Sequence, residues 1–101
     1  MKLTLVEYPF GKRKGFDVDK IYFIIAINDQ GTYMFERWTD SPTSYLCGVV
    51  NSVEEAINTT QCENLAYTDY GECCKDFERI KKWFENQKKE NIIKTLKEIE
   101  V

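Results

Sequence analysis

The fold is decided by one stretch of the chain, KIYFIIAIN at residues 20–28. β-Branched and aromatic residues occupy both of its alternating faces, which is typical of a strand that is covered on both sides. The next residues, NDQG at 28–31, suit a type I turn followed by a left-handed glycine. The sequence therefore predicts a central strand and an antiparallel return strand over residues 32–39. In that return strand Phe35 and Arg37 should point one way while Glu36 and Trp38 point the other, so we expect both faces to be partly covered.

Further strands are predicted on either side of this hairpin in the sequence. Residues 2–8 are rich in strand formers and end at Pro9, so we expect a strand there. Residues 10–19 contain two glycines and three consecutive bases and are predicted to be a loop. Residues 45–50 have the composition of another short strand, which we expect to be bent or bulged at Gly48.

A short helix is predicted from the capping box at residues 52–55. The Ser52 hydroxyl can accept a hydrogen bond from the Glu55 amide, while the Glu55 carboxylate reaches back to Ser52. The helix should run to about Thr60, where β-branched and polar residues weaken it. Three of its residues should turn inward: Val53, Ala56 and Ile57.

The main helix is predicted in the last third of the chain, with Asp69 as its candidate cap. Its apolar residues recur every three or four positions, the pattern of a single apolar helix face. These residues are Cys73, Phe77, Ile80 and Phe84. Residues 86–91 are polar all round, and the apolar spacing resumes in a shifted phase at Ile92, Ile93, Leu96 and Ile99. We therefore expect a kink, a break or a second short helix near residues 86–91.

Together these elements predict a single α+β domain over residues 1–101. Its architecture is a small antiparallel sheet of three or four strands, with a short helix and a longer C-terminal helix packed on it. Hydrophobic residues make up 43% of the 101 residues, enough apolar area to build one core. Intrinsic disorder is therefore not expected.

The longest apolar run indicates a soluble, cytoplasmic chain. This run, residues 21–27, has seven residues, about a third of the ~20 that a membrane-spanning helix needs. The apolar stretch at the amino terminus is interrupted by Thr4 and stopped by Glu7, which does not fit a secretion signal. In the cytoplasm, the four cysteines should be reduced.

The residue types that carry most enzyme chemistry are missing. The chain has no histidine, which removes the commonest general base and the commonest metal ligand. Its cysteines, Cys47, Cys62, Cys73 and Cys74, contain no C-x-x-C pair of the kind that binds zinc. Catalysis by a pair of carboxylates is the alternative, but acidic residues in so charged a sequence usually form a solvated surface. We expect no enzyme activity, no cofactor and no metal site.

The bases at residues 12–14 raise the alternative of nucleic-acid binding. The Lys12-Arg13-Lys14 loop lies between Phe10 and Phe16, so it could contact phosphates while the rings stack on bases. The chain is acidic overall and has no other basic stripe, whereas binding by counterion release needs several phosphate contacts. A nucleic-acid-binding module is therefore the second hypothesis.

Acidic residues are concentrated in the middle of the chain. Between residues 29 and 72, eight acids stand against Arg37 as the single base, so this segment carries −7 while the whole chain carries −3. Large aromatic residues are interleaved with these acids. Aromatic anchors supply contact area at low entropic cost, and carboxylates speed association with a positive partner. The candidate partner-binding residues are Glu36, Trp38, Asp40, Tyr45, Glu54, Glu55, Glu63, Tyr67, Asp69, Tyr70 and Glu72.

The competing interpretation of this segment places Trp38 and Tyr45 in the core and leaves its acids merely exposed. If the acids and rings do form a surface, the sequence favours a small protein-binding inhibitor. The leading hypothesis is an immunity protein of the contact-dependent inhibition type, which binds and neutralises a basic toxin or nuclease. A phage-encoded inhibitor of a host defence nuclease would use the same chemistry. The expected partner is a basic protein, and neither a membrane nor nucleic acid is expected to be bound.

Overall fold

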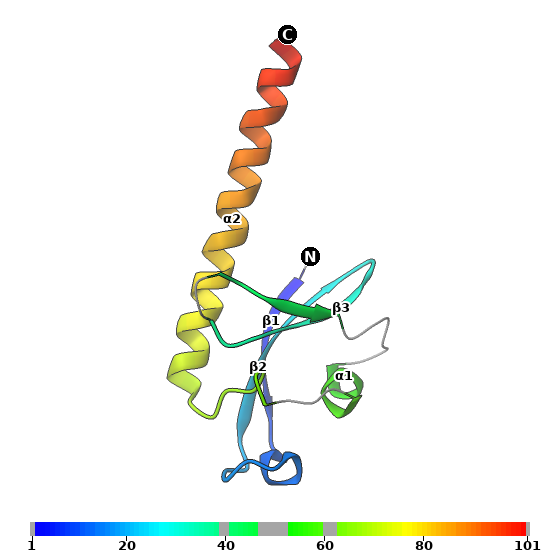
Figure 1. The fold of residues 1–101 in the computed structure, drawn as a ribbon, viewed down its shortest axis with the longest axis vertical. Helices are drawn as coiled ribbons and strands as arrows, with labels where there is room; N and C mark the ends of the chain where they lie inside the picture. Colours follow the sequence, from blue (N-terminus) through cyan, green and yellow to red (C-terminus); the bar gives the residue numbers. More distant parts are fainter. Residues whose placement is uncertain (1, 39–40, 47–52, 60–62, 101) are drawn as a thin grey trace.

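The computed structural model describes residues 2–38, 41–46, 53–59 and 63–100, with residues 45, 46, 59 and 87–100 described by their backbone alone. Four antiparallel strands form one sheet in the order β1-β2-β3-β4, and two α-helices lie on either side of it (Figure 1). The strands are β1 (Lys2–Tyr8), β2 (Ile21–Asn28), β3 (Gly31–Phe35) and β4 (Ser44–Leu46). The helices are the 3-10 helix η1 (Gly11–Lys14), α1 (Val53–Thr59) and α2 (Tyr70–Glu100). The predicted α+β fold, with one short and one longer C-terminal helix, is confirmed.

The central strand is β2, as predicted. β1 pairs with every residue of β2 except Asn28, and β3 pairs with its second half. Because successive side chains alternate, Phe23 and Ile25 face α1 while Ile24 and Ala26 face α2. All four side chains are fully buried. We call these two sides of the sheet the α1 face and the α2 face.

The predicted hairpin joins β2 to β3. Asn28 pairs with Gly31, and its side-chain oxygen accepts hydrogen bonds from the main-chain N–H groups of Gln30 and Gly31 at 2.8 and 3.1 Å. Gly31 has a positive φ of 152°, a value that favours glycine. The asparagine side chain and the glycine together close the turn.

β3 is shorter than the predicted return strand and ends at Phe35. The Glu36 N–H still bonds to the Thr43 carbonyl, the next position of the β3–β4 register, whereas the N–H groups of Arg37 and Trp38 bond to the Asn64 carbonyl and the Asp76 carboxylate. Since Arg37 and Trp38 have left the strand ladder, the alternation of side chains is not maintained. Trp38 consequently packs in the same cluster as Phe35, on the α2 face, and the prediction that it points the opposite way is wrong.

α1 covers one face of the sheet. It buries Ala56 and Ile57, with Val53 packed against the same cluster, as the sequence predicts. Two other predictions lie outside the described residues, namely the bend at Gly48 and the capping role of Ser52. A helix of seven residues is too short to be stable alone in water, so α1 depends on these contacts.

Part of the predicted loop at residues 10–19 forms η1, which ends at Gly15 in a left-handed conformation with φ of 91°. From η1, the Lys14 ammonium donates to the carbonyls of Ile57 and Asn58 at 2.9 and 3.4 Å. These carbonyls lie in the last turn of α1, where the helix dipole favours a cation. Lys14 therefore fastens the end of α1 to η1.

The chain crosses from the α1 face to the α2 face at residues 63–69. Leu65 and Ala66 belong to the core of the α1 face, whereas Tyr67 belongs to that of the α2 face. The main-chain N–H and C=O of Tyr67 both bond to those of Tyr22, each at 2.8 Å. Tyr67 thus takes the place of a neighbouring strand where β3 does not reach.

α2 covers the second face of the sheet. The Asp69 side chain accepts a hydrogen bond from the Gly71 N–H at 3.0 Å, which confirms it as the cap. The four predicted apolar residues pack in the core of the α2 face: Cys73, Phe77, Ile80 and Phe84. The break predicted near residues 86–91 is absent, because α2 continues to Glu100 through residues that form helices readily. Its C-terminal half projects beyond the sheet (Figure 1).

Candidate protein-binding site

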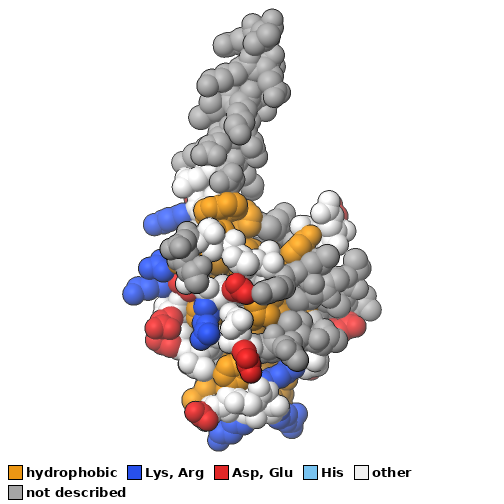
Figure 2. Space-filling model, in the orientation of Figure 1, with side chains coloured by type: hydrophobic (Ala, Val, Ile, Leu, Met, Phe, Trp, Pro, Cys, Tyr) orange, Lys and Arg blue, Asp and Glu red, His pale blue; other side chains and the backbone are white. Residues whose placement is uncertain are grey.

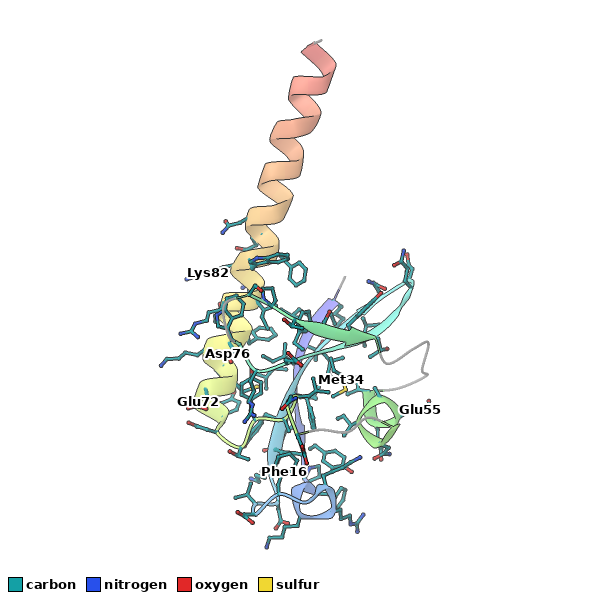
Figure 3. All side chains as sticks on the ribbon, in the orientation of Figure 1. Phe16, Met34, Glu55, Glu72, Asp76 and Lys82 are labelled. Carbon is teal, nitrogen blue, oxygen red and sulfur yellow. The ribbon has the colours of Figure 1, made fainter. Side chains whose placement is uncertain are left out.

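The predicted acidic residues are divided between the two sides of the sheet. Glu54 and Glu55 lie on α1, while Asp69 and Glu72 lie at the start of α2. Figure 3 shows Glu55 and Glu72 on opposite sides of the molecule. On the face drawn in Figure 2, acidic side chains are scattered among lysines and arginines. The −7 charge of the middle segment is therefore not concentrated on one surface, because the sheet separates α1 from α2.

The other predicted residues have different environments. Glu63 is exposed in the turn before Tyr67, and Glu36 is half-buried just after β3. Trp38 is half-buried against the core of the α2 face. Tyr67 is 2% exposed and so lies in the core rather than on a binding surface. Asp40 and the side chain of Tyr45 lie outside the described residues.

Tyr67 belongs to a buried hydrogen-bond network centred on Asp76. The Tyr67 hydroxyl donates to Asp76 Oδ2 at 2.6 Å, and the Trp38 main-chain N–H donates to the same oxygen at 3.1 Å. The Arg79 guanidinium donates to Oδ1 at 3.3 Å. Burial of the ring, and then the hydrogen bond to Asp76, raises the pKa of Tyr67, so its hydroxyl stays protonated. This network joins three segments of the chain and has a structural role.

Two predicted residues, Asp69 and Tyr70, do come together, beside two that the sequence did not single out. Tyr70 is 56% exposed, and its ring centroid lies 5.2 Å from that of Tyr22. The Tyr22 hydroxyl donates to Glu7 Oε1 at 3.4 Å, and the charge of Asp69, next to Tyr70, also acts on Tyr22. Glu72 lies two positions after Tyr70 on α2, so it belongs to another side of the helix. We call the surface formed by Glu7, Tyr22, Asp69 and Tyr70 the Tyr70 face.

The Tyr70 face contains a hollow of about 410 Å³, lined by Leu5, Glu7, Tyr22 and Tyr70. The pKa of Tyr22 is raised, first by burial and then by the negative charge of Glu7. The pKa of Tyr70 is raised, chiefly by its interaction with the Cys74 thiol. Both hydroxyls are therefore neutral at pH 7, and the negative charge of this face comes from its carboxylates. Aromatic rings beside carboxylates suit a cationic side chain, through charge and through cation–π contact.

Sequence reasoning missed Glu7 and Tyr22 in this site and Asp76 in the core. Glu7 precedes the acidic segment, and Tyr22 lies in the run that forms the central strand. They meet because β1 pairs with β2 in the register that sets Glu7 opposite Tyr22, so aligning the two predicted strands would have been the signal. Asp76 stands four residues before Ile80 on the apolar face of α2, and a charge at such a position signals a buried partner.

The three bases of the predicted nucleic-acid loop all have partners within the chain. Lys14 binds carbonyls of α1, and the Arg13 guanidinium carbon lies 4.4 Å from the centroid of the Phe10 ring. Lys12 forms an exposed ion pair with Asp19 at 3.9 Å. Lys12 and Arg13 remain on the surface, whereas the Lys14 ammonium is used within the fold.

Among the described residues, no group of three or more histidine, cysteine, aspartate or glutamate side chains is placed to hold a metal ion. Cys73 is fully buried and Cys74 is half-buried, both as free thiols. Burial raises the pKa of the Cys73 thiol to about 12, so this thiol stays protonated at neutral pH. The other two cysteines, Cys47 and Cys62, lie outside the described residues.

Comparison of the chain with protein-family models, with curated protein sequences and with solved structures gave no significant match. Within the part of the chain that the structure describes, no helix has the length and apolar character needed to cross a membrane. The Tyr70 face is therefore interpreted from its own chemistry.

Proposed function

We propose that this protein acts in the cytoplasm as a binding protein, which engages a basic protein through the Tyr70 face and blocks it. An immunity protein of the contact-dependent inhibition type neutralises a toxin or nuclease in this way. The observation that carries the proposal is the exposed Tyr70 ring, packed against Tyr22 beside the Glu7 carboxylate. A ring that is already supported by a second ring loses little entropy when it is buried against a partner, which makes it a suitable anchor.

The carboxylates of the face support a partner of positive charge, but they are not equivalent. Asp69 caps α2, where a negative charge stabilises the helix itself. Glu7 is exposed on a strand and has no such helix-stabilising role. Changing Glu7 therefore tests binding with the least effect on folding.

Capture of partners from an extract of the native host tests the proposal. The tagged protein should retain one basic protein in stoichiometric amount at low salt and release it at high salt, because exposed charges are screened. The double variant Glu7→Gln/Tyr70→Ala should lose most of this protein. Its matched control is Trp83→Ala/Glu85→Gln, which also removes one exposed acid and one partly exposed ring, from another part of α2.

Inhibition of the captured protein is the direct check on the function. The wild type and the control variant should suppress its activity, whereas the variant of the Tyr70 face should not. Equal retention by the two double variants, or retention of no basic protein by the wild type, would contradict the proposal.

A further inference from the structure

β1 is an edge strand whose outer side is regular. It pairs with β2 at seven successive positions without a bulge, and it lies at the end of the sheet order. Natural edge strands are usually short, bulged or interrupted by proline, which prevents further pairing. β4, at the other end of the order, has three residues, whereas β1 has seven, and residues 3–6 of β1 are all partly exposed.

The register identifies the main-chain groups of β1 that point away from the sheet. Both main-chain groups of Tyr22 bond to Tyr67, so they point away from β1. Glu7, which stands opposite Tyr22, is therefore in a non-hydrogen-bonded pair, and its own N–H and C=O point outward. Because this pattern repeats every second residue, the N–H and C=O groups of Leu5 and Leu3 also point outward.

Hollows lie along β1 on both sides of the sheet. On the α2 face is the hollow of the Tyr70 face, which Leu5 and Glu7 line. On the α1 face, a second hollow of about 380 Å³ lies between β1 and α1, and its lining includes Val6, Tyr8 and Ile57. The side chains of a strand added to β1 would alternate between these two hollows.

We propose that β1 binds an extended segment of the partner as an additional antiparallel strand. A lysine or arginine of this segment lies on the α2 face opposite Glu7, and apolar residues lie on the α1 face. The charge of the segment rests on the proposed function, whereas its extended form rests on the outward main-chain groups of Leu3, Leu5 and Glu7. In strand addition, main-chain hydrogen bonds provide affinity and alternate side chains provide specificity.

A second copy of the chain fits this edge less well. If two β1 strands paired, the side chains on the α2 face would come from residues 3, 5 and 7 of each copy, because opposite residues share a face. Those residues are Leu3, Leu5 and Glu7, so the paired strands would place no base opposite Glu7. A partner segment that carries lysine or arginine supplies the missing charge.

The test uses the isotope-labelled full chain and a capped peptide of about nine residues, slightly longer than β1, in which lysine alternates with valine. In the free protein, the amides of Leu3, Leu5 and Glu7 should exchange with solvent faster than those of Thr4 and Val6, which face β2. Saturating peptide should slow exchange at the first three amides by at least about tenfold and leave the other two unchanged.

Two N-methylated peptides provide matched controls with the same charge. The lysines opposite Leu5 and Glu7 would turn their N–H groups toward β1, while the valines would turn theirs away. Methylation of the lysine amides should weaken binding more than about tenfold, since several hydrogen bonds are lost. Methylation of the valine amides should leave binding nearly unchanged.

The outcomes separate this inference from the proposed function. Equal effects of the two methylated peptides, absence of protection at Leu3, Leu5 and Glu7, or failure of the lysine–valine peptide to bind would overturn strand addition. If the host protein were still captured through Glu7 and Tyr70, the proposed function would stand without it. Conversely, if amide exchange and the methylated peptides behaved as expected but no basic protein were captured, only the proposed function would be overturned.

Discussion

The α1 face and the α2 face of the sheet differ in what covers the central strand. On the α1 face, Phe23 and Ile25 pack in a cluster whose buried members are all apolar. On the α2 face, Ile24 and Ala26 lie under a helix that also carries Asp76, which is 8% exposed and accepts hydrogen bonds from Tyr67, Trp38 and Arg79. The core cluster of the α1 face is apolar, with Thr32 buried on the same side of the sheet, whereas the core of the α2 face combines apolar packing with a buried carboxylate.

The difference concerns how narrowly each face specifies the path of the chain. An apolar cluster accepts many arrangements of similar volume. A buried carboxylate is costly unless its donors are in place, so Asp76 requires the Trp38 N–H and the Tyr67 hydroxyl to meet at α2. We infer that the α2 face determines where the chain leaves β3 and where it crosses the sheet.

Removal of the Asp76 carboxylate should have the largest effect on stability. Asp76→Ala leaves the buried Tyr67 hydroxyl and the Trp38 N–H without their acceptor, and should lower the free energy of unfolding by about 2–4 kcal/mol. Urea unfolding followed by tryptophan fluorescence measures this change. Asp76→Asn, which keeps one acceptor oxygen, should lose less.

A double-mutant cycle shows whether the network acts as a unit. Tyr67→Phe removes the hydroxyl that Asp76→Ala would leave unsatisfied, so the double variant should be more stable than the sum of the two single changes implies. Strict additivity would mean that the carboxylate and the hydroxyl do not depend on each other, and the contrast between the two faces would then fail.

Much of the fold could be predicted because it follows from local patterns. The all-apolar run at residues 21–27 indicates a strand covered on both faces, and the spacing from Cys73 to Phe84 indicates a helix with one buried face. Trp38 was assigned to the wrong face because the strand ends at Phe35, where hydrogen bonds to distant segments replace the ladder. The sequence alone does not show those distant partners.

The binding site was less predictable because it depends on register and on the sides of the sheet. Asp69 and Tyr70 are adjacent in sequence and stay together in the structure. Glu54 and Glu55 belong to the same acidic segment but lie beyond the sheet, on α1. Charge counted along the chain does not record which face a helix covers, and this was the missing information.

A smaller effect is expected from the buried thiol of the α2 face at alkaline pH. Cys73 has a pKa of about 12 in the fold, against 9.0 for the free thiol, so above pH 9 the unfolded chain loses a proton that the folded chain keeps. The contribution of the thiol is complete below pH 9 and is lost as pH rises from 9 toward 12. At pH 10 this loss amounts to about 1 kcal/mol.

The variant Cys73→Ala isolates this contribution. Its free energy of unfolding should fall less steeply between pH 9 and pH 10 than that of the wild type, whatever the two values are at pH 7. The pKa of Tyr67 is also raised from 10.0, so the stability that its hydroxyl contributes is lost only above pH 10, and in both proteins alike. Parallel pH profiles for the two proteins would show that the thiol does not titrate differently in the fold.

The smallest effect is expected on the α1 face, at the contact between Lys14 and the end of α1. Lys14→Met keeps the length of the side chain but removes the ammonium that binds the carbonyls of Ile57 and Asn58. Loss of a cation at a helix C-terminus should lower the free energy of unfolding by about 0.5–1 kcal/mol. Urea unfolding measures the total, and amide exchange in α1 locates it.

Lys12→Met is the matched control, because it removes a neighbouring base whose ion pair with Asp19 is exposed and 3.9 Å long. Exposed pairs of this kind contribute little, so exchange in α1 should rise for Lys14→Met and not for Lys12→Met. If both variants changed α1 alike, the bases would act through general charge rather than through one contact. A difference between them would mean that even the apolar α1 face uses one directed polar contact, placed where its seven-residue helix ends.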